Sequence, residues 1–183
     1  MKKSYTIISK VIRAIDRFTA IYVYLVALLL VPMILANVVE VLMRYVLNSP
    51  TTWAADATVM SYGALFMLGS AFAMLKGAHV RTDMFFENFT NRTKGIIDGI
   101  SYLFLFLPVM GIIFVISFDS FLYSYSINER SILGLWRPII WPFRAIIPLS
   151  ALLMFIQGIS EFLKALWAAI TGEELVHHEK VEV

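Results

Sequence analysis

The hydrophobic positions of this chain form four long runs that are separated by short polar stretches. Because a helix rises about 1.5 Å per residue, about 20 apolar residues are enough to cross a hydrocarbon layer of about 30 Å. Each run reaches that length, which predicts an all-α membrane protein with four transmembrane helices. The predicted spans cover residues 18–43, 53–75, 97–123 and 141–170, and we expect Pro32 to bend the first span.

The segment before the first span follows a different pattern. Within residues 1–17, apolar side chains recur at spacings of three and four, and five basic residues lie between them. This pattern is typical of an amphipathic helix that lies in the headgroup plane of a membrane. At the other end of the chain, residues 171–183 are polar and are expected to form a tail.

The composition agrees with a membrane protein of modest size. Of the 183 residues, 60% are hydrophobic and 15% are charged, whereas soluble domains average about 45–50% apolar and about 25% charged residues. The net charge of +2 is too small for a nucleic-acid-binding surface. The chain has no cysteine, which excludes disulfides, thiolate metal sites and cysteine catalysis.

The distribution of basic residues predicts the orientation of the chain. Lys and Arg near the ends of membrane spans favour the cytoplasmic side. If both termini lie inside, the N-terminal segment, the second loop and the C-terminal end place eleven basic residues in the cytoplasm, and the opposite side holds four. We therefore expect both termini in the cytoplasm.

The depth of the charged residues indicates whether the chain could conduct ions. A charge at the bilayer centre costs at least about 2.5–3.5 kcal/mol and is therefore usually functional. Counting along each span places Glu40 at the outer interface, and Glu161 and Lys164 near the inner end. The midplanes fall at apolar residues, near Leu30, Leu65, Val109 and Leu153.

These apolar midplanes argue against several classes of membrane protein. A pump needs a titratable group partway across the membrane, and a membrane-embedded hydrolase needs a buried nucleophile and base. A membrane cytochrome needs axial histidines within its spans, but the three histidines lie in a loop and in the tail. We therefore expect no catalysis, no cofactor and no metal.

The turn after the first span contains several polar residues at helical spacing. Glu40 and Arg44 are four residues apart with the acid first, the favourable order for an ion pair on a helix. We expect Asn48 to lie in the turn, Trp53 to anchor the next span at the interface, and Asp56 to return towards Arg44. This pattern favours a structural turn over a binding site.

Three further features concern helix packing and the loop after the second span. Gly69, Ala73 and Gly77 repeat every four residues and could let another helix approach closely, although small residues are also common in such spans. Gln157 in the fourth span is expected to bond a neighbouring helix. The loop after the second span contains an interfacial cluster, expected to be structural, made of His79, Arg81 and Asp83.

Taken in order, these residues resemble the small membrane subunit of tripartite ATP-independent periplasmic (TRAP) transporters. The four-helix layout and the basic start of the chain fit that family as well. Where the family commonly has Glu after the Trp, this chain has Asp56. The resemblance rests on Arg44-Tyr45, Asn48, Trp53, Asp56, Gly69, His79-Val80-Arg81, Asp83, Pro142-Phe143-Arg144, Pro148 and Gln157-Gly158.

The resemblance implies partners and a location. It implies a large membrane subunit (the M type) with an elevator-type transport domain, and a soluble periplasmic substrate-binding protein (the P type) that captures an organic acid. Sodium and substrate would bind the large subunit, and this chain would be a non-catalytic scaffold, among lipids in the cytoplasmic membrane of a bacterium or archaeon. Arg130, Arg137 and Arg144 would be candidates for docking the binding protein.

An alternative reading of the same pattern does not require partners. An independent four-helix membrane protein could form a small oligomeric channel or act as an assembly factor. A conductive, self-associated species without any partner would indicate this alternative.

Overall fold

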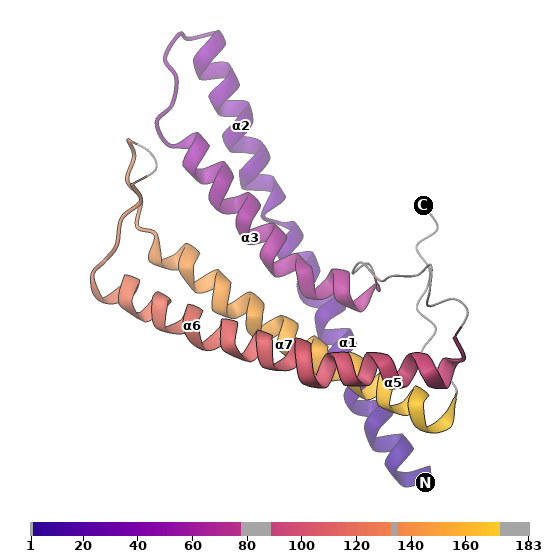
Figure 1. Ribbon diagram of the computed structural model, residues 1–183. Helices are drawn as coiled ribbons and strands as arrows, with labels where there is room; N and C mark the ends of the chain where they lie inside the picture. The colour runs from indigo at the N-terminus through magenta and orange to yellow at the C-terminus, as the bar shows by residue number, and fades with distance from the viewer. Residues whose placement is uncertain (1, 78–88, 133–134, 173–183) are drawn as a thin grey trace. The chain divides into compact units, whose positions relative to one another are not determined.

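The computed structural model describes residues 2–77, 89–132 and 135–172, with side chains from residue 8 onward (Figure 1). Within these residues, four helical runs are long and apolar enough to cross a membrane, in agreement with the four predicted spans. The helices are α1 (Lys2–Ala27), α2 (Leu30–Tyr45), α3 (Ala54–Leu75), α5 (Asn91–Ser101), the π-helical segment η1 (Tyr102–Phe106), α6 (Leu107–Ser126) and α7 (Trp141–Thr171).

The first run is interrupted between α1 and α2, one turn before Pro32. A proline ring clashes with the carbonyl four residues earlier, which here belongs to Leu28. At this point the backbone changes to tighter bonds, from the Leu29 N–H to the Val26 carbonyl at 3.0 Å and from the Val31 N–H to the Leu28 carbonyl at 3.1 Å. The irregularity expected at Pro32 is therefore present, and it takes the form of a short break.

The N-terminal segment is helical, as predicted, but it continues into the first span. α1 runs from Lys2 to Ala27 without a break near residue 17. One side of this segment packs within the chain, since Ile12 and Ser9 are buried. The placement of residues 1–17 in the headgroup plane stays a prediction.

The third run contains a single π-helical segment. Pro108 has no backbone N–H, and its ring crowds the carbonyl of Phe104. η1 precedes it, and there the Leu107 N–H bonds the Tyr102 carbonyl, five residues back. A π-bulge of this kind lets a helix accommodate a proline without ending, so Asn91–Ser126 remains one helical run.

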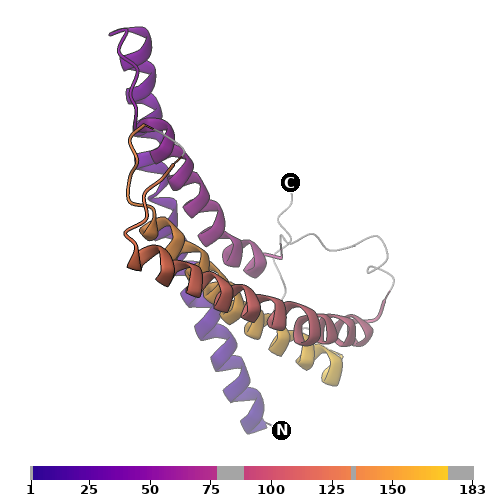
Figure 2. The same cartoon turned by 60° about the vertical axis from the view of Figure 1, so that its left-hand side comes forward.

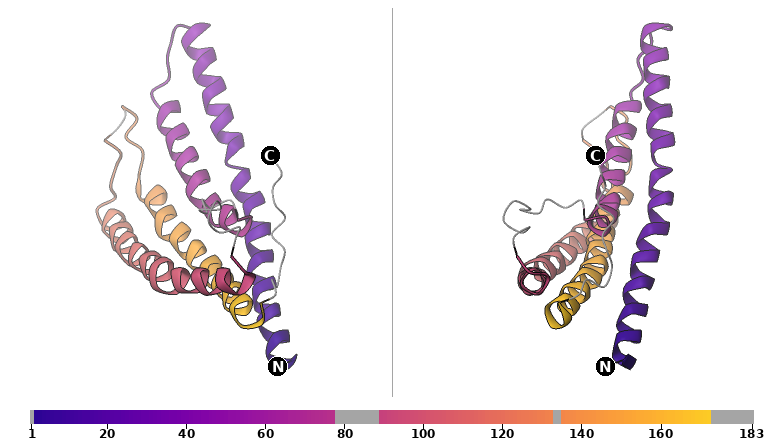
Figure 3. Two further views of the ribbon diagram at one scale, coloured as in Figure 1. Left: turned by 45° about the vertical axis from the view of Figure 1, so that its right-hand side comes forward. Right: turned by 90° about the vertical axis from the view of Figure 1, so that its right-hand side faces the viewer.

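The chain divides into two compact units, and the division falls within α1, α3, α6 and α7. The first unit comprises Met1–Ile21, Ser70–Ile113 and Ala151–Val183, and the second comprises Tyr22–Gly69 and Phe114–Ser150. In the first unit, α5 lies beside the C-terminal part of α7 (Figure 2). In the second, α2 lies beside α3, and the end of α6 lies beside the start of α7 (Figure 3).

Close packing in the first unit depends on Gly95 in α5. A Cβ atom at this position would lie 2.5 Å from the backbone nitrogen of Ala169 and 2.7 Å from the carbonyl oxygen of Ala165. The same contact is supported by Arg92, whose Nε donates to the Ala169 carbonyl at 3.1 Å. Thr90 caps the start of α5 by accepting a hydrogen bond from the Thr93 N–H.

Polar and aromatic contacts connect the helices of the second unit. Asn37 in α2 donates from its side-chain nitrogen to the Thr58 hydroxyl in α3 at 3.0 Å. The Tyr22 hydroxyl donates to the Leu68 carbonyl at 2.9 Å. Near the loop between α6 and α7, the Trp141 ring meets the edge of Tyr125 at a centroid distance of 5.2 Å.

The packing at Gly95 predicts a specific stability defect. Gly95→Ala should lower the free energy of unfolding by about 1–3 kcal/mol, because the new methyl group must push α5 away from backbone atoms of α7. Gly99→Ala is the matched control in the same helix, since a Cβ there meets no atom within 4 Å. Denaturant titration in detergent measures both, and equal stability of the two variants would contradict the close approach.

Candidate functional site

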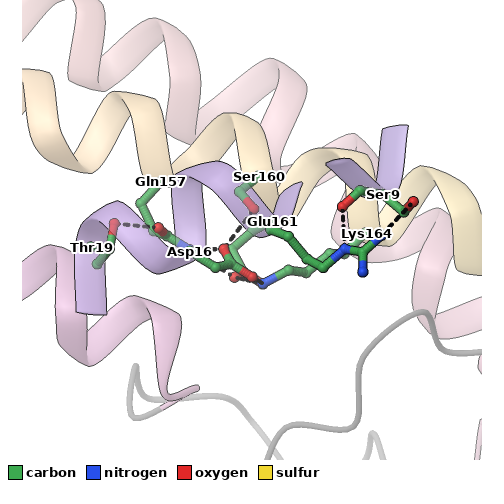
Figure 4. Close-up of polar contacts among 8 residues, drawn as sticks. Ser9, Asp16, Thr19, Gln157, Ser160, Glu161 and Lys164 are labelled. Atoms are coloured by element: carbon green, nitrogen blue, oxygen red, sulfur yellow. Dashed lines mark hydrogen bonds and ion pairs between the residues drawn. The ribbon is translucent and has the colours of Figure 1, made fainter. Parts of the chain in front are cut away.

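The most extensive buried polar contacts among the described residues join α1 to α7 in the first unit (Figure 4). Lys164 lies at the centre, with its Nζ atom 2.8 Å from Asp16 Oδ2 and 2.7 Å from Glu161 Oε1. The exposed fractions of these side chains are 10% for Lys164, 18% for Asp16 and 3% for Glu161. We call this group, together with Thr19, Gln157 and Ser160, the α1–α7 polar cluster.

Hydrogen bonds close the α1–α7 polar cluster around Gln157. Its side-chain nitrogen donates to Asp16 Oδ1 at 3.1 Å and to Glu161 Oε1 at 3.2 Å. Its oxygen accepts from the Thr19 hydroxyl at 2.8 Å, and the Ser160 hydroxyl donates to Asp16 at 2.8 Å. Gln157 therefore bonds a neighbouring helix, as the sequence predicted, and that helix is α1.

The pattern of residues 1–17 does not indicate that Asp16 belongs to this cluster. Asp16 was assigned to the headgroup segment, and Glu161 and Lys164 to the inner end of the fourth span. Gln157 is one residue past the midpoint of α7, and Glu161 follows one turn later. A clue was present in the spacing of Gln157, Glu161 and Lys164, which places all three on one face of a helix.

The cluster contains two carboxylates and one ammonium group, and each charge has partners within the chain. Burying such groups without partners costs several kcal/mol per ion. The ammonium group of Lys164 forms ion pairs with both Asp16 and Glu161. The two carboxylates also accept hydrogen bonds from the Gln157 amide, and Asp16 accepts one from the Ser160 hydroxyl. The arrangement can hold α1 against α7, with the two carboxylates sharing one ammonium group and each charged group bonded within the chain.

In the second unit, Glu40 holds the turn between α2 and α3. Arg44 Nε donates to Glu40 Oε1 at 2.9 Å, which confirms the expected ion pair along the helix. The second oxygen of Glu40 accepts from the backbone N–H of Thr51 at 2.9 Å, and also from the Thr51 hydroxyl. Glu40 therefore ties the end of α2 to the approach to α3.

The expected contact between Asp56 and Arg44 is wrong. Arg44 is held by Glu40, which lies one turn earlier on its own helix. Asp56 lies in the first turn of α3, and its Oδ2 atom is buried with no hydrogen-bond partner among the described residues. A carboxylate on the same helix is already in reach of Arg44 without crossing the turn, and this explains the difference.

Asn48 and Trp53 define the two ends of the same turn. Asn48 has a φ of 51°, a left-handed conformation that Asn tolerates better than most residues. The following N–H, of Ser49, returns to the Met43 carbonyl at 2.9 Å and closes the end of α2. Trp53 comes directly before α3 and is partly exposed, as an interfacial anchor would be.

A comparison of the sequence with protein families decides the family of this chain. Residues 33–167 match the family described as tripartite ATP-independent periplasmic transporters, DctQ component. The chain belongs to this family. The match includes the Glu40 turn and the part of the α1–α7 polar cluster that lies on α7. No curated protein and no solved structure matched the chain.

Membership of the DctQ family establishes the general character of the chain. It is the small membrane component of a TRAP transporter, a multi-pass membrane protein and not an enzyme. The sequence-based identification of the family is therefore confirmed. The family implies that the chain works with other TRAP components.

The three arginines that the resemblance suggested for docking differ in their surroundings in this DctQ protein. Arg144 Nη2 lies 2.6 Å from Glu129 Oε1, and its Nη1 donates to the Ser120 hydroxyl at 3.2 Å. It holds the loop between α6 and α7 and has no free guanidinium to offer. Arg130 and Arg137 are exposed, and neither has an acidic partner among the described residues.

The small residues of α3 do not act as one packing stripe. Gly77 lies beyond the end of α3 with a φ of 67°, so it ends the helix and the prediction that it packs along α3 is wrong. Gly69 and Ala73 are half-buried, and a Cβ on Gly69 would meet no atom of this chain within 4 Å. The interfacial cluster predicted in the following loop, His79, Arg81 and Asp83, lies outside the described residues.

Charge counting in the α1–α7 polar cluster predicts an order of severity for two substitutions. Lys164→Met leaves two buried carboxylates without a cation and should lower the free energy of unfolding by about 3–5 kcal/mol. Asp16→Asn leaves a neutral Lys164–Glu161 pair and should cost about 1–2 kcal/mol, mainly through weaker hydrogen bonds. Denaturant titration measures both values, and a larger loss for Asp16→Asn would contradict the assignment of the charges.

Proposed function

We propose that this DctQ protein is a stationary scaffold for the large, elevator-type membrane subunit of its transporter. The large subunit would carry out sodium-coupled uptake of an organic acid that a periplasmic binding protein delivers. The observation that supports this role most directly is the α1–α7 polar cluster. Its ammonium group and two carboxylates lie between α1 and the second half of α7, and each is already bonded to other groups of this chain in a way that joins the two helices.

The apolar surfaces of the chain support a role in a larger membrane complex. The most apolar 18-residue stretch of the Asn91–Ser126 run has none of its residues buried within the chain. In α3, Tyr62 and Phe66 are exposed and Gly69 has open space beside it. Such faces can be covered by lipid or by the helices of another subunit, and glycine permits a close helix approach.

We further propose that both termini lie in the cytoplasm, as the basic residues predict. The turn between α2 and α3 and the loop between α6 and α7 then face the periplasm, where a binding protein arrives. The pair of Glu40 and Arg44 would hold the first of these connections in a fixed shape. The substrate would be chosen by the other subunits.

Gly69 offers a test of the contact with the large subunit. Gly69→Leu should leave the unfolding of the isolated chain nearly unchanged, because open space surrounds this position. If the large subunit packs on this face of α3, the larger side chain should reduce the amount of large subunit that co-purifies with the chain. Quantitative co-purification from cells expressing all components measures the effect.

Gly63→Leu is the contrasting variant on the same helix. A Cβ at Gly63 would lie 2.9 Å from Cζ of Phe143, so this variant should destabilise the chain itself. If the Gly69→Leu chain co-purifies with as much large subunit as the wild-type chain does, the large subunit does not use this face of α3. Recovery of a conductive self-associated species in place of any complex would contradict the scaffold and support an independent channel.

A further inference from the structure

Backbone contacts hold together the two ends of the loop that joins α6 to α7. We call these ends, residues 129–131 and 138–140, the base of the loop. Arg130 and Ile139 form an antiparallel β-bridge. The Ser131 N–H donates to the Pro138 carbonyl at 2.8 Å, and the Ile140 N–H donates to the Glu129 carbonyl at 2.9 Å. The ion pair between Glu129 and Arg144 fastens this base to the start of α7. These contacts hold the two ends of the loop together at the start of α7.

Three of the four described residues beyond this base are apolar and exposed, and the fourth is Arg137. Ile132 is 91% exposed, Leu135 is 88% exposed and Trp136 is 48% exposed. Ser131, in contrast, is buried at the base. This order is the reverse of the usual one in a loop surrounded by water, where polar side chains point outward and apolar ones are covered.

Two positive charges flank the apolar residues. Arg130 and Arg137 are exposed and have no acidic partner among the described residues, whereas Glu129 is already paired with Arg144. Arginine binds phosphate through a planar set of donors, and tryptophan favours the level of the lipid headgroups. The combination matches a phospholipid surface in both its apolar and its charged parts.

The loop end of α6 also exposes apolar residues. The end of α6 exposes Leu122, Tyr123 and Tyr125, and the first residue after it, Ile127, is exposed as well. A docking site for a soluble protein is usually bordered by a polar rim. Four polar residues, 128–131, separate Ile127 from Ile132, but the loop directly follows a helical run long enough to cross the membrane, which favours lipid as the occupant.

From this arrangement we infer that the α6–α7 loop is a lipid anchor. Ile132 and Leu135 enter the boundary between headgroups and acyl chains, and Trp136 lies at the headgroup level. Arg130 and Arg137 bind phospholipid phosphates. The anchor fixes the loop end of α6 and α7 at the membrane surface, independently of any protein partner.

Because the chain has no cysteine, single labels can test this inference directly. In Leu135→Cys, a fluorescent label on the full-length chain should be quenched by spin-labelled lipid in phosphatidylethanolamine and phosphatidylglycerol nanodiscs and protected from aqueous iodide. Ser49→Cys is the matched control, since Ser49 is exposed in the turn between α2 and α3 and lies beside the polar residue Asn48. Its label should show the opposite pattern.

Two results would overturn the anchor. One is iodide quenching at Leu135→Cys equal to that at Ser49→Cys in nanodiscs. The other is protection that arises only after the binding protein or the large subunit is added, which would assign the loop to a protein partner. Adding Arg130→Gln and Arg137→Gln to the Leu135→Cys chain should weaken the lipid quenching, and unchanged quenching would exclude the phosphate contacts.

Discussion

The pairing of charges within the chain is the constraint on which the rest of the structure depends. A membrane-spanning chain has little water around its helices, so a charged group in or near the bilayer needs a partner from the protein. In the first unit, Asp16, Glu161 and Lys164 meet this need by joining α1 to α7. In the second, the pairs Glu40–Arg44 and Glu129–Arg144 fix the two connections between helices.

This pairing also explains why the chain suits a supporting role. The charged groups hold the protein together, and large parts of the outer faces of α3 and α6 remain apolar. A stationary subunit of a TRAP transporter needs stable helices and broad surfaces for lipid and for a neighbouring subunit. In the scaffold role proposed above, other polypeptides of the complex would carry out the transport.

Much of the architecture could be predicted because it depends on local sequence. The length of the apolar runs gave the four spans, Pro32 located the break in the first run, and the spacing of Glu40 and Arg44 predicted their ion pair. The spans follow from continuous apolar stretches, and the break and the ion pair are determined by residues one helical turn apart. The family could likewise be recognised from the order of a few residues along the chain.

The features that could not be predicted depend on contacts between distant residues. Nothing near Asp16 in the sequence indicates that Lys164 will be its partner, because that contact requires α1 to pack on α7. Gly95 precedes the predicted third span, 97–123, yet it belongs to α5 and lies against the backbone of α7. Asp56 was assigned to Arg44 by proximity along the chain, although Glu40 was closer on the same helix.

Solute uptake by purified components tests the central claim most directly. Proteoliposomes would contain this chain alone, or this chain with the large subunit, each with a sodium gradient, the binding protein and a labelled organic acid. We predict no sodium-dependent uptake with this chain alone, and uptake only when the large subunit is present. Sodium-dependent uptake by this chain alone would contradict the scaffold role.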